Sequence, residues 1–135
     1  MLRKIIFSVA LLLSVGFASA QVKFQDVSPE ELLKMAESED KLVFIDIYAD
    51  WCPPCRAMES EVFSRKDVAE FMDARFVSAK YNMDKDTGKE IAARYNVRSI
   101  PTYLIFNDKG DFLGRLQGKM PAEDFMENIN MALTK

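Results

Sequence analysis

The amino-acid sequence predicts an α/β fold in which a central mixed β-sheet is flanked by helices on both faces. Strand-like and helix-like segments alternate through residues 21–95, an order typical of parallel strands joined by helices. The last third instead carries two strand-like segments joined by a turn at residues 107–110, which indicates an antiparallel hairpin. Residues 41–48 are almost continuously apolar, as expected for a central strand that is covered on both faces.

Each element follows from its hydrophobic period and from the residues at its ends. Strands are expected at residues 21–27, 41–48, 75–81, 102–106 and 111–117. Helices are expected at residues 28–38, 56–62, 87–95 and 121–133, with a further helix that begins near residue 64. Three helix starts carry residue pairs that can form capping boxes: Ser28 with Glu31, Ser64 with Asp67, and Thr87 with Glu90.

Residues 1–20 are predicted to be a signal peptide that directs export, into the periplasm or otherwise out of the cytoplasm, with cleavage near Ala20. Arg3 and Lys4 provide a positive leader, and residues 5–17 are almost wholly apolar. Residues 18–20 match the small-x-small pattern of a cleavage site. An uncleaved N-terminal anchor is the alternative, although the apolar stretch is short for a membrane span.

The remaining 115 residues, 21–135, are enough for one domain with a hydrophobic core. The formal net charge is −3 for the whole chain and −5 once Arg3 and Lys4 are removed. A mildly acidic domain argues against nucleic acid or anionic lipid as the main partner, and we expect a monomer. The chain has no histidine, which removes the commonest general base and a common metal ligand.

Cys52 and Cys55 are the only two cysteines, and they lie three positions apart where a strand gives way to a helix. Thiols at this spacing can form a small disulfide ring, which makes the pair a candidate two-electron switch. The unpaired N–H groups of a helix start favour a thiolate, the species that attacks disulfides. A structural disulfide is the alternative, but so short a loop would constrain little of the unfolded chain.

The chain resembles the thioredoxin-fold oxidoreductases over nearly all of residues 41–133. The features that carry the resemblance are Asp46, the segment 49–55 (ADWCPPC), Lys80, Asn82, the segment 99–102 (SIPT) and Gly118. The resemblance implies a thioredoxin-like domain at residues 21–135 and a redox-active disulfide in place of a bound cofactor.

One branch of this family is the most similar, namely the C-terminal periplasmic domain of the transmembrane thiol:disulfide interchange reductase. Glu59, residues 61–64 (EVFS) and residues 67–68 resemble that domain. Cytoplasmic thioredoxins usually carry a kinking proline in this helix, and residues 58–60 contain none. The resemblance implies exported proteins with disulfides as substrates, and it leaves open whether a membrane protein or another donor supplies the electrons.

The expected chemistry assigns a role to five side chains. Cys52, partly exposed at the helix start, attacks a disulfide, and the buried Cys55 resolves the mixed disulfide. Asp46 is the candidate that accepts the proton of Cys55, and Lys80 tunes the charge of Asp46. Glu59 disfavours the thiolates by like-charge repulsion. The alternatives are that Asp46, Lys80 and Glu59 simply face solvent at element ends or on the surface.

A substrate groove is expected beside the cysteines. The resemblance implies a cis peptide bond between Ile100 and Pro101, so that this loop can present backbone groups to an extended peptide. Trp51, Pro53 and Gly118 would complete a small apolar groove around Cys52. Flat apolar contact with main-chain pairing suits many flexible protein partners.

The residues between the cysteines favour the reducing direction. Pro53 and Pro54 have no N–H groups, so few donors remain to stabilise a Cys52 thiolate. The disulfide is then less destabilised than in a strongly oxidising enzyme. A disulfide oxidase or isomerase, a zinc site shared between two chains, and a redox-inert binding domain remain as alternatives.

Overall fold

The computed structural model describes residues 20–135, and the predicted signal peptide therefore falls almost entirely outside the described residues. The strands are β1 (Leu42–Tyr48), β2 (Phe76–Asn82), β3 (Thr102–Phe106) and β4 (Phe112–Gln117). The helices are α1 (Pro29–Glu39), α2 (Pro53–Met58), the π-helix η1 (Glu59–Phe63), α3 (Lys66–Asp73), α4 (Asp86–Arg94) and α5 (Ala122–Leu133). Within this part of the chain, no helix is both long enough and apolar enough to cross a membrane.

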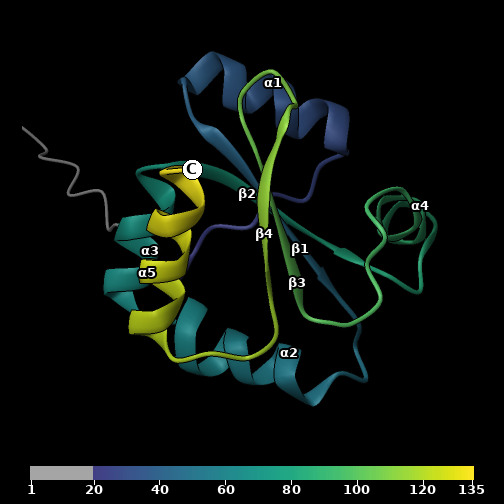
Figure 1. Ribbon diagram of the computed structural model, residues 1–135, viewed down its shortest axis with the longest axis vertical. Coiled ribbons are helices and arrows are strands. Elements are labelled where there is room, and N and C mark those ends of the chain that lie inside the picture. The colour runs from purple at the N-terminus through teal and green to yellow at the C-terminus, as the bar shows by residue number, and fades with distance from the viewer. Residues whose placement is uncertain (1–19) are drawn as a thin grey trace, which may run out of the picture.

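The four strands, labelled in Figure 1, form one mixed sheet in the order β2-β1-β3-β4. Strands β1 and β2 are parallel, whereas β3 pairs antiparallel with both β1 and β4. The predicted mixed sheet and the C-terminal hairpin are both confirmed. The parallel register places Asp46 opposite Lys80 and Tyr48 opposite Asn82, so β1 and β2 end at the same edge.

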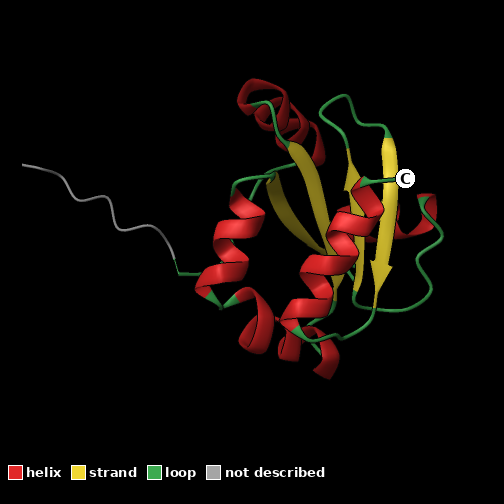
Figure 2. Ribbon diagram, turned by 60° about the vertical axis from the view of Figure 1, so that its left-hand side comes forward, coloured by secondary structure: helices red, strands yellow, loops and turns green. Residues whose placement is uncertain are grey.

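Helices cover both faces of the sheet, as predicted (Figures 1 and 2). Helices α2, η1, α3 and α5 pack on one face, around a cluster of aromatic rings from Phe44, Phe63, Tyr103 and Phe125. Helices α1 and α4 pack on the other face, over the side chains of strand residues of opposite parity. The sheet is thus buried on both sides, which accounts for the continuous apolar sequence of β1 and β3.

The predicted ends of the helices and strands are confirmed at some positions and wrong at others. Ser28 caps α1 as predicted, and its hydroxyl accepts a hydrogen bond from the Glu31 N–H at 3.2 Å. The predicted strand at 21–27 is wrong, because only a single bridge from Phe24 to Ser78 forms there. This segment runs past the edge of β2 without building a regular ladder.

The predicted caps of α3 and α4 are also wrong. Helix α3 begins one residue after Arg65, and the carboxylate of Asp67 binds the Arg65 guanidinium at 2.7 Å. Helix α4 begins at Asp86, one residue before Thr87. No side chain caps this helix, and its first turn packs tightly on the end of β2, since a Cβ atom at Gly88 would lie 1.9 Å from the carbonyl oxygen of Asn82.

The predicted helix at 56–62 changes from α-helical to π-helical geometry part of the way along. Helix α2 has α geometry to Met58, and Glu59–Phe63 continues it as a π-helix. A π turn accommodates an extra residue and shifts the side chains that follow. Val62 and Phe63 are both buried as a result.

Candidate active site

Cys52 and Cys55 form a disulfide at the start of α2, with their Cα atoms 5.3 Å apart. Cys52 is the N-cap residue, and its sulfur accepts a hydrogen bond from the Cys55 N–H at 3.2 Å. The Arg56 N–H bonds instead to the backbone carbonyl of Cys52 at 3.2 Å. In the described chain, therefore, one backbone donor reaches the Cys52 sulfur, and the prolines at the first two helical positions supply none.

The exposure of the two cysteines differs from the sequence-based expectation. Trp51 is prominently exposed, at 63%, but Cys52 is only 2% exposed and Cys55 6% exposed in the disulfide form. The Cys52 sulfur turns inward and lies 3.8 Å from the carbonyl oxygen of Ile100. The expected partial exposure of Cys52 is therefore wrong for the oxidised protein, because the proline loop covers the sulfur.

Asp46 lies in the core, on the face of the sheet that α2 covers. Its side chain is 3% exposed, so the alternative that Asp46 faces solvent is wrong. Burial raises the pKa of Asp46 to about 7, the positive charge of Lys80 opposes this rise, and the negative charge of Glu59 adds to it. A carboxyl group with a pKa near 7 can exchange a proton at neutral pH.

Lys80 and Glu59 form an ion pair between β2 and the first residue of η1. The ammonium group of Lys80 also lies 4.8 Å from the centre of the Tyr48 ring. Burial acts to lower the pKa of Lys80, but the hydrogen bond and charge of Glu59 outweigh it and the pKa is raised. Both groups are partly buried, with 32% of the Lys80 side chain and 43% of the Glu59 side chain exposed, so they pair with each other while still in contact with solvent.

Of the five residues expected to frame a groove, some adjoin the disulfide and others belong to, or bond to, the loop that faces it. The Ile100–Pro101 peptide bond is cis, and the Ile100 carbonyl faces the Cys52 sulfur. Gly118, at a φ of +84°, donates its N–H to the Pro101 carbonyl at 2.9 Å. Trp51 and Pro53 flank Cys52 in sequence and are both exposed.

A polar network that the sequence-based reasoning missed holds the exposed tryptophan in place. The indole N–H of Trp51 donates to the Asp84 carboxylate at 2.7 Å. The Asp84 N–H in turn donates to the Asn82 side-chain oxygen at 2.9 Å, and the Asn82 amide donates to Asp50 at 3.3 Å. These polar residues lie at or just after the carboxyl ends of the parallel strands β1 and β2, and that position was the available signal.

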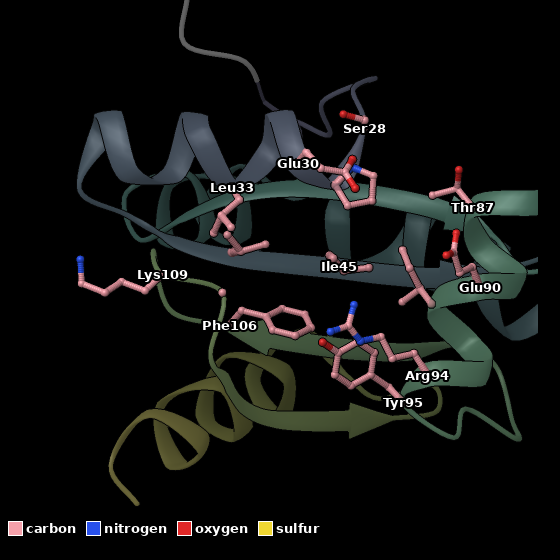
Figure 3. Close-up of a pocket in the computed structure, with 14 residues that line it drawn as sticks. Ser28, Glu30, Leu33, Ile45, Thr87, Glu90, Arg94, Tyr95, Phe106 and Lys109 are labelled. Atoms are coloured by element: carbon pink, nitrogen blue, oxygen red, sulfur yellow. The ribbon is translucent and has the colours of Figure 1, made fainter.

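A cavity of about 450 Å³ lies away from the disulfide (Figure 3). It opens between α1 and α4, with Leu33 and Arg94 on its walls and Ile45 and Phe106 on its floor. Ile45 and Asp46 are adjacent in β1, so their side chains point to opposite faces of the sheet. The cavity therefore belongs to the face that does not carry the acid, and no part of the expected site lines it.

The fold and the site define a class of protein. A mixed sheet covered on both faces, a Cys-X-X-Cys disulfide at a helix start and a proline loop against the first sulfur are those of a thiol:disulfide oxidoreductase. The family described as a thioredoxin-like domain matches residues 29–132, and the chain belongs to this family. Across residues 20–135, no group of three or more potential metal-ligating His, Cys, Asp or Glu side chains comes together.

The chain is similar to proteins of the thiol:disulfide interchange type. It is 35% identical over 116 residues to the thiol:disulfide interchange protein DsbD 2 of Pseudomonas aeruginosa, covering 81% of this chain but only 20% of that protein. The chain thus spans about a fifth of the length of this relative.

Two solved structures show how far the similarity of fold extends. A candidate disulphide-isomerase from Bacteroides thetaiotaomicron shares 34% identity, with a TM-score of 0.78 and coverage of 86% of this chain and 96% of that one. The oxidised C-terminal domain of DsbD from Neisseria meningitidis has a TM-score of 0.64 at 24% identity, covering 76% and 91% of the two chains. The second similarity concerns the fold alone.

Proposed function

We propose that this protein is exported and reduces disulfides in other exported proteins through Cys52 and Cys55. The proposal of export rests on the leader pattern of residues 1–20 and on the similarity to DsbD proteins. The proposal of a reducing direction rests on the single backbone N–H that reaches the Cys52 sulfur. A thiolate with few donors is weakly stabilised, and the disulfide form is then correspondingly harder to reduce.

The reaction begins when the Cys52 thiolate attacks one sulfur of a substrate disulfide. A mixed disulfide forms and the other substrate sulfur leaves as a thiolate, which takes up a proton. Cys55 then transfers its proton to the Asp46 carboxylate and attacks the Cys52 sulfur. The Cys52–Cys55 disulfide forms, the second substrate sulfur leaves, and the substrate has gained two electrons from the protein.

The surroundings of the disulfide support this sequence of steps. Asp46, with a pKa near 7, accepts a proton from Cys55 and can return it, either directly or through water. Lys80 and Glu59 set the charge around Asp46. The loop at Ile100 and Pro101, to which Gly118 bonds, presents backbone groups that hold an extended substrate strand against Cys52. A membrane-bound dithiol protein is the proposed electron donor.

Trapping tests the assignment of the two cysteines. In Cys55→Ser, Cys52 can attack a substrate but nothing displaces it, so mixed disulfides with exported proteins should accumulate. Cys52→Ser should form none and should lose insulin reduction. Mixed disulfides that persist in Cys52→Ser but not in Cys55→Ser would reverse the assignment.

The reduction potential tests the direction. We expect a potential well below the oxidising end of the family range, which is about −120 mV, and a value near that figure would instead indicate an oxidase. An N-cap side chain accepts from the second or third helical N–H, and here Pro54 is the second position and Cys55 the third. Pro54→Ala adds a donor and should raise the potential by about 30 mV, equivalent to a tenfold change in the equilibrium constant.

Pro53→Ala is the matched control, because it adds an N–H at the first helical position, which an N-cap side chain does not normally accept. The two variants remove the same ring from neighbouring positions of the same turn. Equal shifts in potential would show that loss of backbone rigidity, and not a new hydrogen bond to sulfur, governs the redox equilibrium.

A further inference from the structure

The side chain of Tyr103 places a hydroxyl group inside the aromatic core. Its ring stacks on Phe44 at a centroid distance of 5.4 Å and meets Phe63 and Phe125 edge-on at 5.7 and 5.8 Å. Tyr103 is fully buried, and among residues 20–135 its hydroxyl has no hydrogen-bond partner. Burial of a hydroxyl without a partner is unfavourable, and a phenylalanine would make the same ring contacts without that cost.

The position of Tyr103 in the sheet explains what its hydroxyl can reach. Tyr103 in β3 lies directly opposite Asp46 in the antiparallel pair with β1, so both side chains leave the same face. The Oδ1 atom of Asp46 is likewise buried and, in the part of the chain described, unpartnered. Two unsatisfied polar groups therefore project from facing positions into one buried region.

The electrostatics of Tyr103 agree with this placement. Burial raises the pKa of the Tyr103 hydroxyl, and the negative charges of Asp46 and Glu59 raise it further. The hydroxyl is therefore protonated at every pH at which Asp46 titrates, and it is available as a donor.

We propose that the Tyr103 hydroxyl and the Asp46 carboxyl are joined by hydrogen bonds through one internal water, and that Tyr103 is a positioning residue for Asp46. An ionised carboxylate can only accept, and a hydrogen bond to a charged acceptor is about twice as strong as a neutral one. The hydroxyl therefore favours the charged form of Asp46, the form that takes the proton from Cys55. This inference rests on the role proposed above for Asp46.

Other charged and titratable groups also face Asp46 and must be held constant in a test. They are Lys80 from β2, Glu59 from η1 and Tyr48 from β1, while Cys52, the N-cap of α2, and Cys55 within α2 do not titrate in the disulfide form. A Tyr103→Phe substitution changes none of these groups and keeps the ring that packs on Phe44.

The test is the pKa of Asp46 in the oxidised protein, followed by carbon NMR of its labelled carboxyl group. In Tyr103→Phe we expect this pKa to rise from near 7 by about one unit, a tenfold weakening of proton release. Ser78→Ala is the matched control, because Ser78 also carries a buried, unpartnered hydroxyl but lies opposite Phe44 in the register of β1 and β2. An unchanged or lowered pKa in Tyr103→Phe, or an equal rise in Ser78→Ala, would overturn the proposal.

A measurement on the unmodified protein guards against a variant that folds poorly. With the tyrosine Cζ carbons labelled, the Tyr103 signal should shift as Asp46 titrates between pH 5 and 9, and a flat signal would overturn the proposal.

The outcome of the Tyr103→Phe test can be told apart from the outcome for the proposed function. If Asp46→Asn left the pH dependence of mixed-disulfide release unchanged, Asp46 would not carry the proton of Cys55. The Tyr103→Phe shift would still report the hydrogen bond, because carbon NMR of the carboxyl group does not depend on activity.

Discussion

Replacing Asp46 by asparagine should make the oxidised protein more stable at neutral pH. In the folded protein the pKa of Asp46 is about 7, whereas an unfolded aspartate titrates near 3.8. Between these values the folded state holds a proton that the unfolded state has released, so stability falls as pH rises through this interval. Above about pH 7 Asp46 is ionised in both the folded and the unfolded state, and the loss of stability is complete.

The size of the effect follows from the width of that interval. Each pH unit in which only the folded state is protonated costs about 1.4 kcal/mol, so the two units from pH 5 to 7 correspond to about 3 kcal/mol. Asp46 is almost fully buried, so solvent screening reduces this figure little. Asparagine is uncharged throughout, so the stability advantage of Asp46→Asn should grow by about 3 kcal/mol between pH 5 and 8.

The assay is urea unfolding of both proteins at pH 5, 6, 7 and 8 with the disulfide intact, so that thiol titration does not contribute. Asp124→Asn, an exposed carboxylate in the first turn of α5, is the control and should show a difference that does not change over this range. A stability difference for Asp46→Asn that is the same at pH 5 and pH 8 would refute the reasoning, because it would mean that Asp46 is ionised in the fold at both.

Three further predictions concern the surroundings of the site. Glu59→Gln should lower the pKa of Asp46, because it removes a negative charge and frees a lysine to act on the carboxylate; carboxyl NMR measures the shift. Asp84→Ala should destabilise the fold by about 0.5–1 kcal/mol and change the fluorescence of Trp51, the only tryptophan, because the indole loses its acceptor. Gly88→Ala should destabilise the fold by about 3 kcal/mol in urea unfolding, because its methyl group meets the backbone at the end of β2.

Each of these expectations has an opposite outcome that would count against it. A raised pKa of Asp46 in Glu59→Gln would mean that Lys80 moves away from Asp46 once its ion-pair partner is removed. Unchanged Trp51 emission in Asp84→Ala would show that the indole bond does not persist in solution. Gly88→Ser should be at least as damaging as Gly88→Ala, and a neutral effect of both would contradict the close packing of α4 on β2.

Much of the fold was predictable because local and long-range signals agree. The continuous apolar run of β1 is explained by helices on both faces, and the turn after β3 does close an antiparallel hairpin. The position of Cys52 at a helix start was also predictable, since a strand-like run ends and a proline follows it directly. These features depend on neighbouring residues, which the sequence displays side by side.

Features that depend on residues distant in sequence were missed or misjudged. The ion pair of Lys80 with Glu59 and the bond of Trp51 with Asp84 join groups that come together only once β2 lies beside β1. The inward turn of Cys52 depends on the Ile100 carbonyl, which comes from another part of the chain. Capping patterns failed at α3 and α4: no side-chain cap forms at either helix start, and at α3 the carboxylate of Asp67 binds the Arg65 guanidinium instead.

The order of the site residues along the chain has a consequence for a protein that is still being made. Both thiols leave the ribosome well before Ile100, whose carbonyl oxygen faces the Cys52 sulfur in the finished fold, and before Gly118, which bonds to the next residue of that loop. Until β3 takes its place beside β1, the two cysteines are ordinary thiols on an incomplete sheet. A nascent or truncated chain that ends before residue 101 would therefore carry the dithiol without the complete proline loop that is proposed to hold substrates against Cys52.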